Sequence, residues 1–171
     1  MRATHAQPAV PSESSPALTR DAPTATQVAG FLAKYSPQLA RSARQMRAKI
    51  RRRMPGGFEF VYDNYNFLVF GYGPTDRPSE AVLSLALAPE WVSLCFLRGA
   101  KLPDPKKLLR GGGNIVRSIR LSGPAHLDHP DVETLIAHAI EKAPSPFPGA
   151  GAPRTVIRSV SKKQRSRRPR D

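Results

Sequence analysis

Four short apolar and aromatic segments follow one another between residues 58 and 97, and they limit the fold more than any other feature of the chain. They are FEFVY (58–62), NFLVFGY (66–72), VLSLALA (82–88) and EWVSLCFL (90–97). Short runs rich in aromatic and β-branched residues, separated by polar turn residues, are typical of antiparallel strands joined in sequence order. NIVRSIRL (114–121) is a fifth candidate strand, and before it we expect a single helical turn at KKLL, capped by Asp104.

Helical patterns lie before and after these strands. The first covers residues 24–35, the second runs from Ser36 to about Met54, and the last begins at Asp128 or His129. Ser36 suits the N-cap of the second helix, and the proline that follows it suits the first helical position. The last helix has the clearest apolar stripe, formed by Val132, Leu135, Ile136, Ala139 and Ile140. Helices grouped on either side of a run of strands predict an α+β domain, with a single antiparallel sheet of about five strands and helices packed on one face.

Composition divides the chain into three parts. Residues 1–23 are rich in Pro, Ala, Ser and Thr and have no apolar periodicity, so we expect a disordered leader. Residues 24–143 hold all the predicted helices and strands, and we expect them to form the ordered domain. Residues 144–171 begin with a Pro/Gly-rich linker and continue into a basic segment, which we also expect to be disordered.

Charge and cysteine content indicate which partners the chain can bind and in which cell compartment it is expected. The chain has 27 Lys and Arg against 13 Asp and Glu, and residues 144–171 alone hold eight Lys and Arg against one Asp. This balance favours nonspecific binding of polyanions, nucleic acid among them, through the basic tail. Cys95 is the only cysteine, which excludes an intrachain disulfide, and no segment approaches the ~20 apolar residues of a membrane span. We therefore expect a cytoplasmic protein without a membrane partner.

Four segments in the middle of the chain have a recognisable pattern, namely the helix ending in RAKIRRRMPGG, the stretch VYDNYN, the segment LPDPKKLLRGGGN and the strand VRSIRL. On these segments the chain, from about Phe31 to Ala143, resembles the YdhG-like family of small α+β domains. Most of that family has no assigned activity, and some members are described as frataxin-like iron chaperones. The resemblance thus implies an α+β domain and, as one alternative function, iron binding.

The long helix departs from what iron binding requires. Between Ser36 and Met54 it has seven basic residues and no acidic one, whereas hard iron ions prefer carboxylate oxygens. We therefore transfer no iron ligand from the family to this chain, and we expect no metal and no cofactor.

The polar cluster YDNYN interrupts the apolar run and is the main candidate binding site. Asp63 and Asn64 have the chemistry of a hairpin turn, which is one sufficient reason for their presence. A turn does not explain why Tyr62 and Tyr65 crowd the same place. If the helices cover one face of the sheet, the other is open, and we expect a ligand face there. Its candidate residues are Tyr62, Asp63, Asn64, Tyr65, Trp91 and Arg117.

The glycine run in LLRGGGNIVR is a second, weaker candidate. Exposed backbone N–H groups at glycines bind anions, and Arg110, Gly112, Gly113 and Arg120 are the residues of such a site here. A helix end followed by a flexible turn explains the same glycines, and the phosphate-loop pattern is absent.

No catalytic constellation is recognisable. HLDHPD (126–131) gathers two imidazoles and two carboxylates, but capping accounts for the Asp residues without a metal. Cys95 lies in an apolar strand, where a structural role is favoured over a reactive thiol.

These features predict a non-enzymatic module that binds an unidentified small ligand or protein partner. The alternatives are a frataxin-like iron chaperone, disfavoured by the basic helix, and nonspecific nucleic-acid association through the basic tail.

Overall fold

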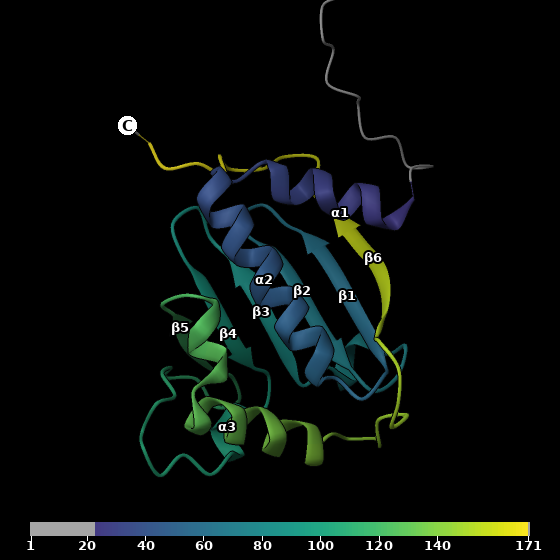
Figure 1. The fold of residues 1–171 in the computed structure, drawn as a ribbon, viewed down its shortest axis with the longest axis vertical. Helices are drawn as coiled ribbons and strands as arrows, with labels where there is room; N and C mark the ends of the chain where they lie inside the picture. Colours follow the sequence, from purple (N-terminus) through teal and green to yellow (C-terminus); the bar gives the residue numbers. More distant parts are fainter. Residues whose placement is uncertain (1–22, 171) are drawn as a thin grey trace, which may run out of the picture.

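The computed structural model describes residues 23–170 and has a mixed sheet of six strands with three α-helices (Figure 1). The leader predicted for residues 1–23 lies outside the described residues, apart from Pro23. The helices are α1 (Thr24–Ala33), α2 (Pro37–Arg53) and α3 (Pro130–Glu141). The strands are β1 (Phe58–Asp63), β2 (Leu68–Gly73), β3 (Leu83–Leu87), β4 (Val92–Phe96), β5 (Arg117–Leu121) and β6 (Arg154–Val160). Three short 3₁₀ helices connect them, η1 (Pro78–Glu80), η2 (Gly99–Lys101) and η3 (Pro124–Asp128).

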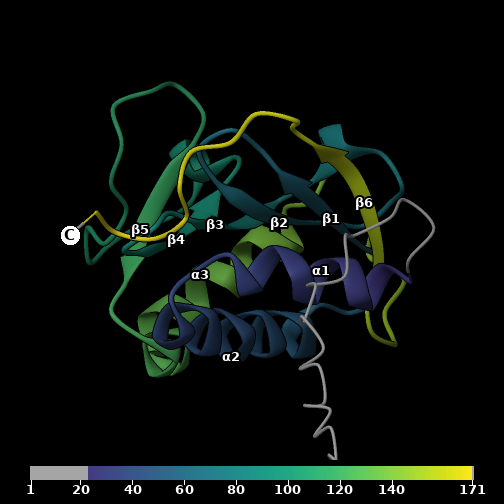
Figure 2. The same ribbon diagram turned by 90° about the horizontal axis from the view of Figure 1, so that it is seen from above.

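The α+β class predicted from the sequence is confirmed, but the sheet is larger than expected and is not purely antiparallel. The strand order is β5-β4-β3-β2-β1-β6. The first five strands form the predicted antiparallel meander, whereas β6 pairs with β1 in parallel. Figure 2 shows the three α-helices on the same side of this sheet, so that no α-helix of residues 23–170 lies on the opposite face.

The local signals for α2 and α3 have the expected effects. The Ser36 side chain accepts a hydrogen bond from the backbone N–H of Leu39 at 3.3 Å, and Pro37 occupies the first turn of α2. At α3 the N-cap is His129, whose Nδ1 accepts from the N–H of Asp131 at 3.2 Å. Apolar residues of all three helices join the inner faces of the strands in one buried core.

The alternation of β1 places its two charged residues toward the helices. Glu59, Val61 and Asp63 point to the helix side, and all three are buried. Their partners across the pair with β2 are Tyr72, Phe70 and Leu68, which belong to the same buried side. Phe58, Phe60 and Tyr62 lie on the opposite face of the sheet, as the period of two predicted.

The turn between β1 and β2 lies further along the chain than the sequence indicated. Asp63 is the last residue of β1, and the N–H of Asn64 donates to the carbonyl of Phe67 at 2.9 Å. Tyr65 and Asn66 therefore form the tip, in place of the predicted pair Asp63 and Asn64.

The prediction that residues 144–171 are disordered is wrong for residues 154–160, which form β6. β6 runs along the β1 edge from Arg154 to Val160, with a register shift between Val61 and Tyr62. The strand is half-exposed to exposed along its length. Edge strands tolerate such polar and charged residues because only one of their sides is paired. The sequence pattern of a buried strand is accordingly absent from it.

Two smaller expectations are also corrected. KKLL does not form a helical turn; the Asp104 carboxylate instead accepts from the N–H groups of Leu108 and Leu109, both at 2.9 Å, and holds an irregular loop. The fifth strand begins at Arg117 and not at residue 114.

We expect Tyr35→Phe to lower the free energy of unfolding by about 1–3 kcal/mol, because two buried backbone groups lose their partner. The Tyr35 hydroxyl donates to the carbonyl of Leu87 at 2.8 Å and accepts from the N–H of Leu68 at 3.1 Å. Burial raises the pKa of Tyr35 to about 12, so the hydroxyl stays protonated at neutral pH. Urea denaturation measures the change. Tyr62→Phe is the control, expected within about 0.5 kcal/mol of the native protein.

Candidate functional site

The structure buries the carboxylate at the centre of the predicted site. Asp63 has no exposed side-chain surface and forms two ion pairs, with Lys34 at the C-cap of α1 at 2.5 Å and with Arg167 at 3.0 Å. Lys34 also donates to the side chain of Gln164 at 2.9 Å. The charge of Asp63 is thus balanced by cations of the same chain.

The C-terminal segment fills the rest of the polar turn. Arg167 is itself buried, and its guanidinium donates to the backbone carbonyls of Asn64 and Tyr65 as well as to Asp63. Gln164 donates to the carbonyl of Asp63 at 3.1 Å. The polar groups around YDNYN therefore serve largely as the attachment point of the C-terminal segment. In the sequence Arg167 is one of several arginines in a basic run, and nothing there distinguishes it from its exposed neighbours.

The six residues predicted to line one ligand face do not converge. Tyr62 lies on the helix-free face, whereas Asp63 lies on the helix side. Trp91 lies at the β3–β4 turn, at the same end of the sheet as the β1–β2 turn, and Arg120 stacks on its ring at 4.3 Å. Arg117 lies at the opposite end, at the start of β5, and donates to the carbonyls of Gly113 and Val116.

The residues of the predicted anion site are likewise separated. Gly112 and Gly113 lie in an exposed loop, where a side chain at either position would meet open space. Arg110 is held by backbone hydrogen bonds to Ser118, and Arg120 lies at Trp91. The geometry does not bring these four residues around one anion.

A buried carboxylate network links β1 to α2. Glu59 accepts two hydrogen bonds from Arg47, at 2.7 and 2.9 Å, and one from Arg51 at 2.7 Å. The hydroxyls of Tyr72 and Thr155 also donate to it, each at 2.8 Å. Burial opposes its ionisation, but the two guanidinium groups outweigh this and hold the pKa of Glu59 below its usual value. Glu59 therefore remains ionised and paired at neutral pH.

Several basic residues of α2 form ion pairs with acidic residues outside this helix. Besides Arg47 and Arg51, Lys49 pairs with Asp128, and Arg53 pairs with Asp128 at 2.8 Å and with Glu133 at 2.9 Å. Asp128 of the HLDHPD cluster is thus engaged with α2. Within residues 23–170, no group of three or more His, Cys, Asp or Glu side chains is arranged to hold a metal ion.

Cys95 lies on the helix-free face of β4 and is half-buried. Burial raises the pKa of its thiol, although a hydrogen bond with Ser84 acts in the opposite direction. The thiol is therefore mainly protonated at neutral pH, which does not favour a nucleophilic role.

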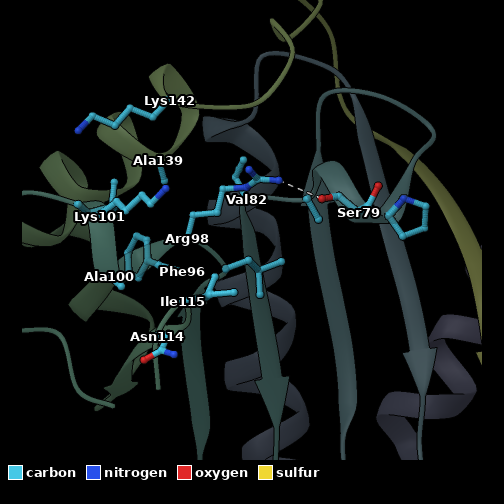
Figure 3. A pocket seen from close by; sticks show the side chains of 14 residues that line it. Ser79, Val82, Phe96, Arg98, Ala100, Lys101, Asn114, Ile115, Ala139 and Lys142 are labelled. Carbon is cyan, nitrogen blue, oxygen red and sulfur yellow. Dashed lines mark hydrogen bonds between the residues drawn. The ribbon is translucent and has the colours of Figure 1, made fainter. Parts of the chain in front are cut away.

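A pocket of about 590 Å³ opens at the end of the sheet opposite YDNYN (Figure 3). Its walls come from η1, from the segment between β4 and Leu102, from the loop before β5 and from the last turns of α3. The inner wall is apolar, with Val82, Phe96 and Ala139 buried in it. The N–H of Ala100 donates to the carbonyl of Ile115 at 3.0 Å, which fixes the loop against η2.

Three cations line this pocket, Arg98, Lys101 and Lys142. Figure 3 shows Lys101 and Lys142 on the α3 side, Ser79 on the opposite side and Arg98 between them. Arg98 donates to the carbonyl of Ser79 at 3.1 Å, and its charge is among the causes that lower the pKa of Glu80, after hydrogen bonds from Thr75 and Ser145.

The electrostatic character of the pocket is positive. Among the described residues, no carboxylate lines it, and neither Lys101 nor Lys142 takes part in an ion pair. Glu80, at the end of η1, is paired with Arg77 at 3.7 Å. Ile115, 60% exposed, adds a large apolar side chain at the rim. Apolar walls with unpaired cations suit a ligand that has both a hydrocarbon part and a negative charge.

Sequence reasoning missed this pocket because its cations are distant in the chain. Arg98 and Lys101 follow a strand directly, and Lys142 ends a helix some forty residues later. Only the topology shows that these element ends meet.

Comparison of the chain with protein-family models, with curated proteins and with solved structures gives no match. In the described part of the chain, no helix is both long and apolar enough to cross a bilayer.

Proposed function

We propose that the protein is a non-enzymatic binding module for a small amphipathic anion, and that the pocket of Figure 3 is its ligand site. The single observation that carries this proposal is the set of three cations on apolar walls without a lining carboxylate. A volume of about 590 Å³ lies within the usual range of small-molecule sites.

The chemistry of the walls favours a particular class of ligand. Arg98 offers a planar set of donors that matches a carboxylate or phosphate, and Lys101 adds a mobile charge. Val82, Phe96 and Ile115 offer contact to an aliphatic or aromatic group. A small aryl or alkyl carboxylate, sulfonate or phosphate satisfies both parts.

Binding is favoured over catalysis by the state of the buried carboxylates. Glu59 and Asp63 lie on one face of β1, where a pair of carboxylates would suit acid–base chemistry. Both carboxylates are instead buried and paired with Arg or Lys side chains. The pKa of Glu59 is also below its usual value, whereas a general acid or base needs a pKa near neutral pH.

The proposal includes membership of the YdhG-like family, which the motifs of the sequence support. It also includes a cytoplasmic location, which the presence of a single cysteine supports. Iron delivery receives no support from the site. The carboxylates Glu59, Asp63 and Asp128 all bind cations of the chain itself.

Titration with 8-anilinonaphthalene-1-sulfonate, a fluorescent aromatic sulfonate, tests the proposal. We expect saturable binding with enhanced fluorescence, weakened about tenfold or more in the double variant Arg98→Gln/Lys101→Gln, because each charged hydrogen bond is worth about 1.5–3 kcal/mol. Lys106→Gln/Lys107→Gln, in the exposed loop that follows η2, is the charge-matched control and should bind within about twofold of the native protein. Equal weakening in both double variants, or no saturable binding by the native protein, contradicts the proposal.

A further inference from the structure

Residues 161–170, called here the strap, cross the end of the sheet that lies opposite the pocket. Figure 1 shows this segment leaving β6 and running across the top of the sheet toward the start of α2. The N–H of Ser161 donates to the carbonyl of Asp63 at 2.8 Å, and the N–H of Arg165 donates to the carbonyl of Tyr65 at 2.9 Å. Pro169 lines a second cavity of about 690 Å³ together with Trp91 and Arg120. The strap is thus fixed by hydrogen bonds at the β1–β2 turn, and its end reaches the cavity beside the β3–β4 turn.

An aromatic ring lies at each of these two turns, Tyr65 at β1–β2 and Trp91 at β3–β4. Tyr65 is 42% exposed, and the guanidinium of Arg165 lies 5.5 Å from the centre of its ring. Trp91 carries Arg120 on its ring in the same way. The β1–β2 and β3–β4 turns are two strand spacings apart, which corresponds to about 10 Å. This spacing suits neighbouring or next-neighbouring bases of an extended single strand.

The surface between the rings is strongly basic. Five strap cations are exposed and take part in no ion pair among residues 23–170, namely Lys162, Lys163, Arg165, Arg168 and Arg170. Asp63 beneath them is buried and neutralised by Lys34 and Arg167. Glu90, exposed beside Trp91, is an opposing charge at one end of the surface.

We propose that the strap, with Tyr65 and Trp91, is a binding surface for single-stranded nucleic acid. Phosphates of the strand pair with the exposed Lys and Arg side chains, and bases stack on the two rings. Stacking tolerates every base, so the surface is expected to bind without sequence preference. An anionic membrane fits less well, because membrane-surface segments need an amphipathic apolar face and the strap is polar along its length.

The surface and the pocket are at opposite ends of the sheet, so the two proposals fail or succeed separately. Trp91 is the only tryptophan of the chain and reports base stacking directly. We expect the oligonucleotides (dT)12 and (rU)12 to quench its fluorescence. The extent of quenching by each shows whether the surface prefers DNA or RNA. Anisotropy of fluorescein-labelled (dT)12 gives the affinity. About three phosphate contacts predict a slope near −2 in log affinity against log salt, and hence about a tenfold or greater loss between 50 and 200 mM salt.

Variants separate this surface from the general charge of the protein. Lys162→Gln/Lys163→Gln/Arg165→Gln should weaken binding and reduce the salt slope, and Tyr65→Ala should weaken binding about tenfold with the slope unchanged. The matched control is Lys106→Gln/Lys107→Gln/Arg110→Gln at the other end of the sheet, expected within about twofold of the native protein. Equal loss in the two triple variants, binding without quenching of Trp91, or capture by phosphatidylserine vesicles without binding of either oligonucleotide overturns the proposal.

Discussion

Replacing Arg167 by methionine should lower the free energy of unfolding by about 3 kcal/mol, because it breaks a buried ion pair and leaves a buried carboxylate with one partner fewer. Arg167 is 3% exposed and donates to Asp63 as well as to the carbonyls of Asn64 and Tyr65. Methionine preserves most of the side-chain volume, so the change reports the lost charge and hydrogen bonds rather than a cavity. Urea denaturation followed by Trp91 fluorescence measures it.

The neighbouring residue provides the control for this prediction. Arg168 is exposed, and Arg168→Met should change the free energy of unfolding by no more than about 0.5 kcal/mol. Similar values for the two variants would mean that the C-terminal segment is not anchored at the β1–β2 turn.

A second large loss of stability is expected when Glu59 is replaced. Glu59→Gln should cost about 3 kcal/mol at pH 7, because it removes the negative charge that Arg47 and Arg51 share beside the core. Both arginines remain partly exposed, with 23% and 25% of their side-chain surface accessible, and this partial hydration keeps the cost at the lower end for buried pairs.

The same substitution changes the dependence of stability on pH. The pKa of Glu59 is lower in the folded protein than in the unfolded chain, so its contribution is present above the unfolded value and is lost as the pH falls through the folded value. The native protein should therefore lose stability below about pH 4.5, and the difference from Glu59→Gln should shrink there. Glu141→Gln, an exposed control, should follow the native curve. A constant difference between pH 7 and pH 3 would contradict the assignment.

Much of the fold could be predicted because its signals are local. The N-cap at Ser36 and the apolar stripe of α3 each depend on residues close in sequence, and the structure confirms both. The meander of β1 to β5 was predicted from the succession of strand patterns, because strands that are consecutive in the sequence are commonly neighbours in a sheet.

β6 and the strap could not be predicted because their order depends on distant partners. The segment Arg154–Val160 has too few apolar residues to mark a strand, and it becomes one by pairing with the free edge of β1, nearly a hundred residues earlier. Asp63 was recognised as an unusual polar residue, but its partner Arg167 is revealed only by the fold. The excess of polar and aromatic residues at YDNYN is therefore explained in part by the docking of the C-terminal segment.

The candidate pocket was missed for a related reason. Ser79, Arg98, Ile115 and Lys142 come from four separate connections and helix ends, and no spacing in the sequence unites them. The sequence instead pointed to the opposite end of the sheet, where the polar groups are already paired with one another.

We propose above that the pocket at η1, η2 and the end of α3 binds a small amphipathic anion. Two-dimensional ¹H–¹⁵N NMR of the full chain, titrated with 8-anilinonaphthalene-1-sulfonate, tests it most directly. If the ligand binds in this pocket, we expect saturable shifts of the amide signals of residues 78–82, 98–102, 114–115 and 139–142. Shifts centred on the strap or spread over the exposed Lys and Arg residues, with these four segments unchanged, would contradict it.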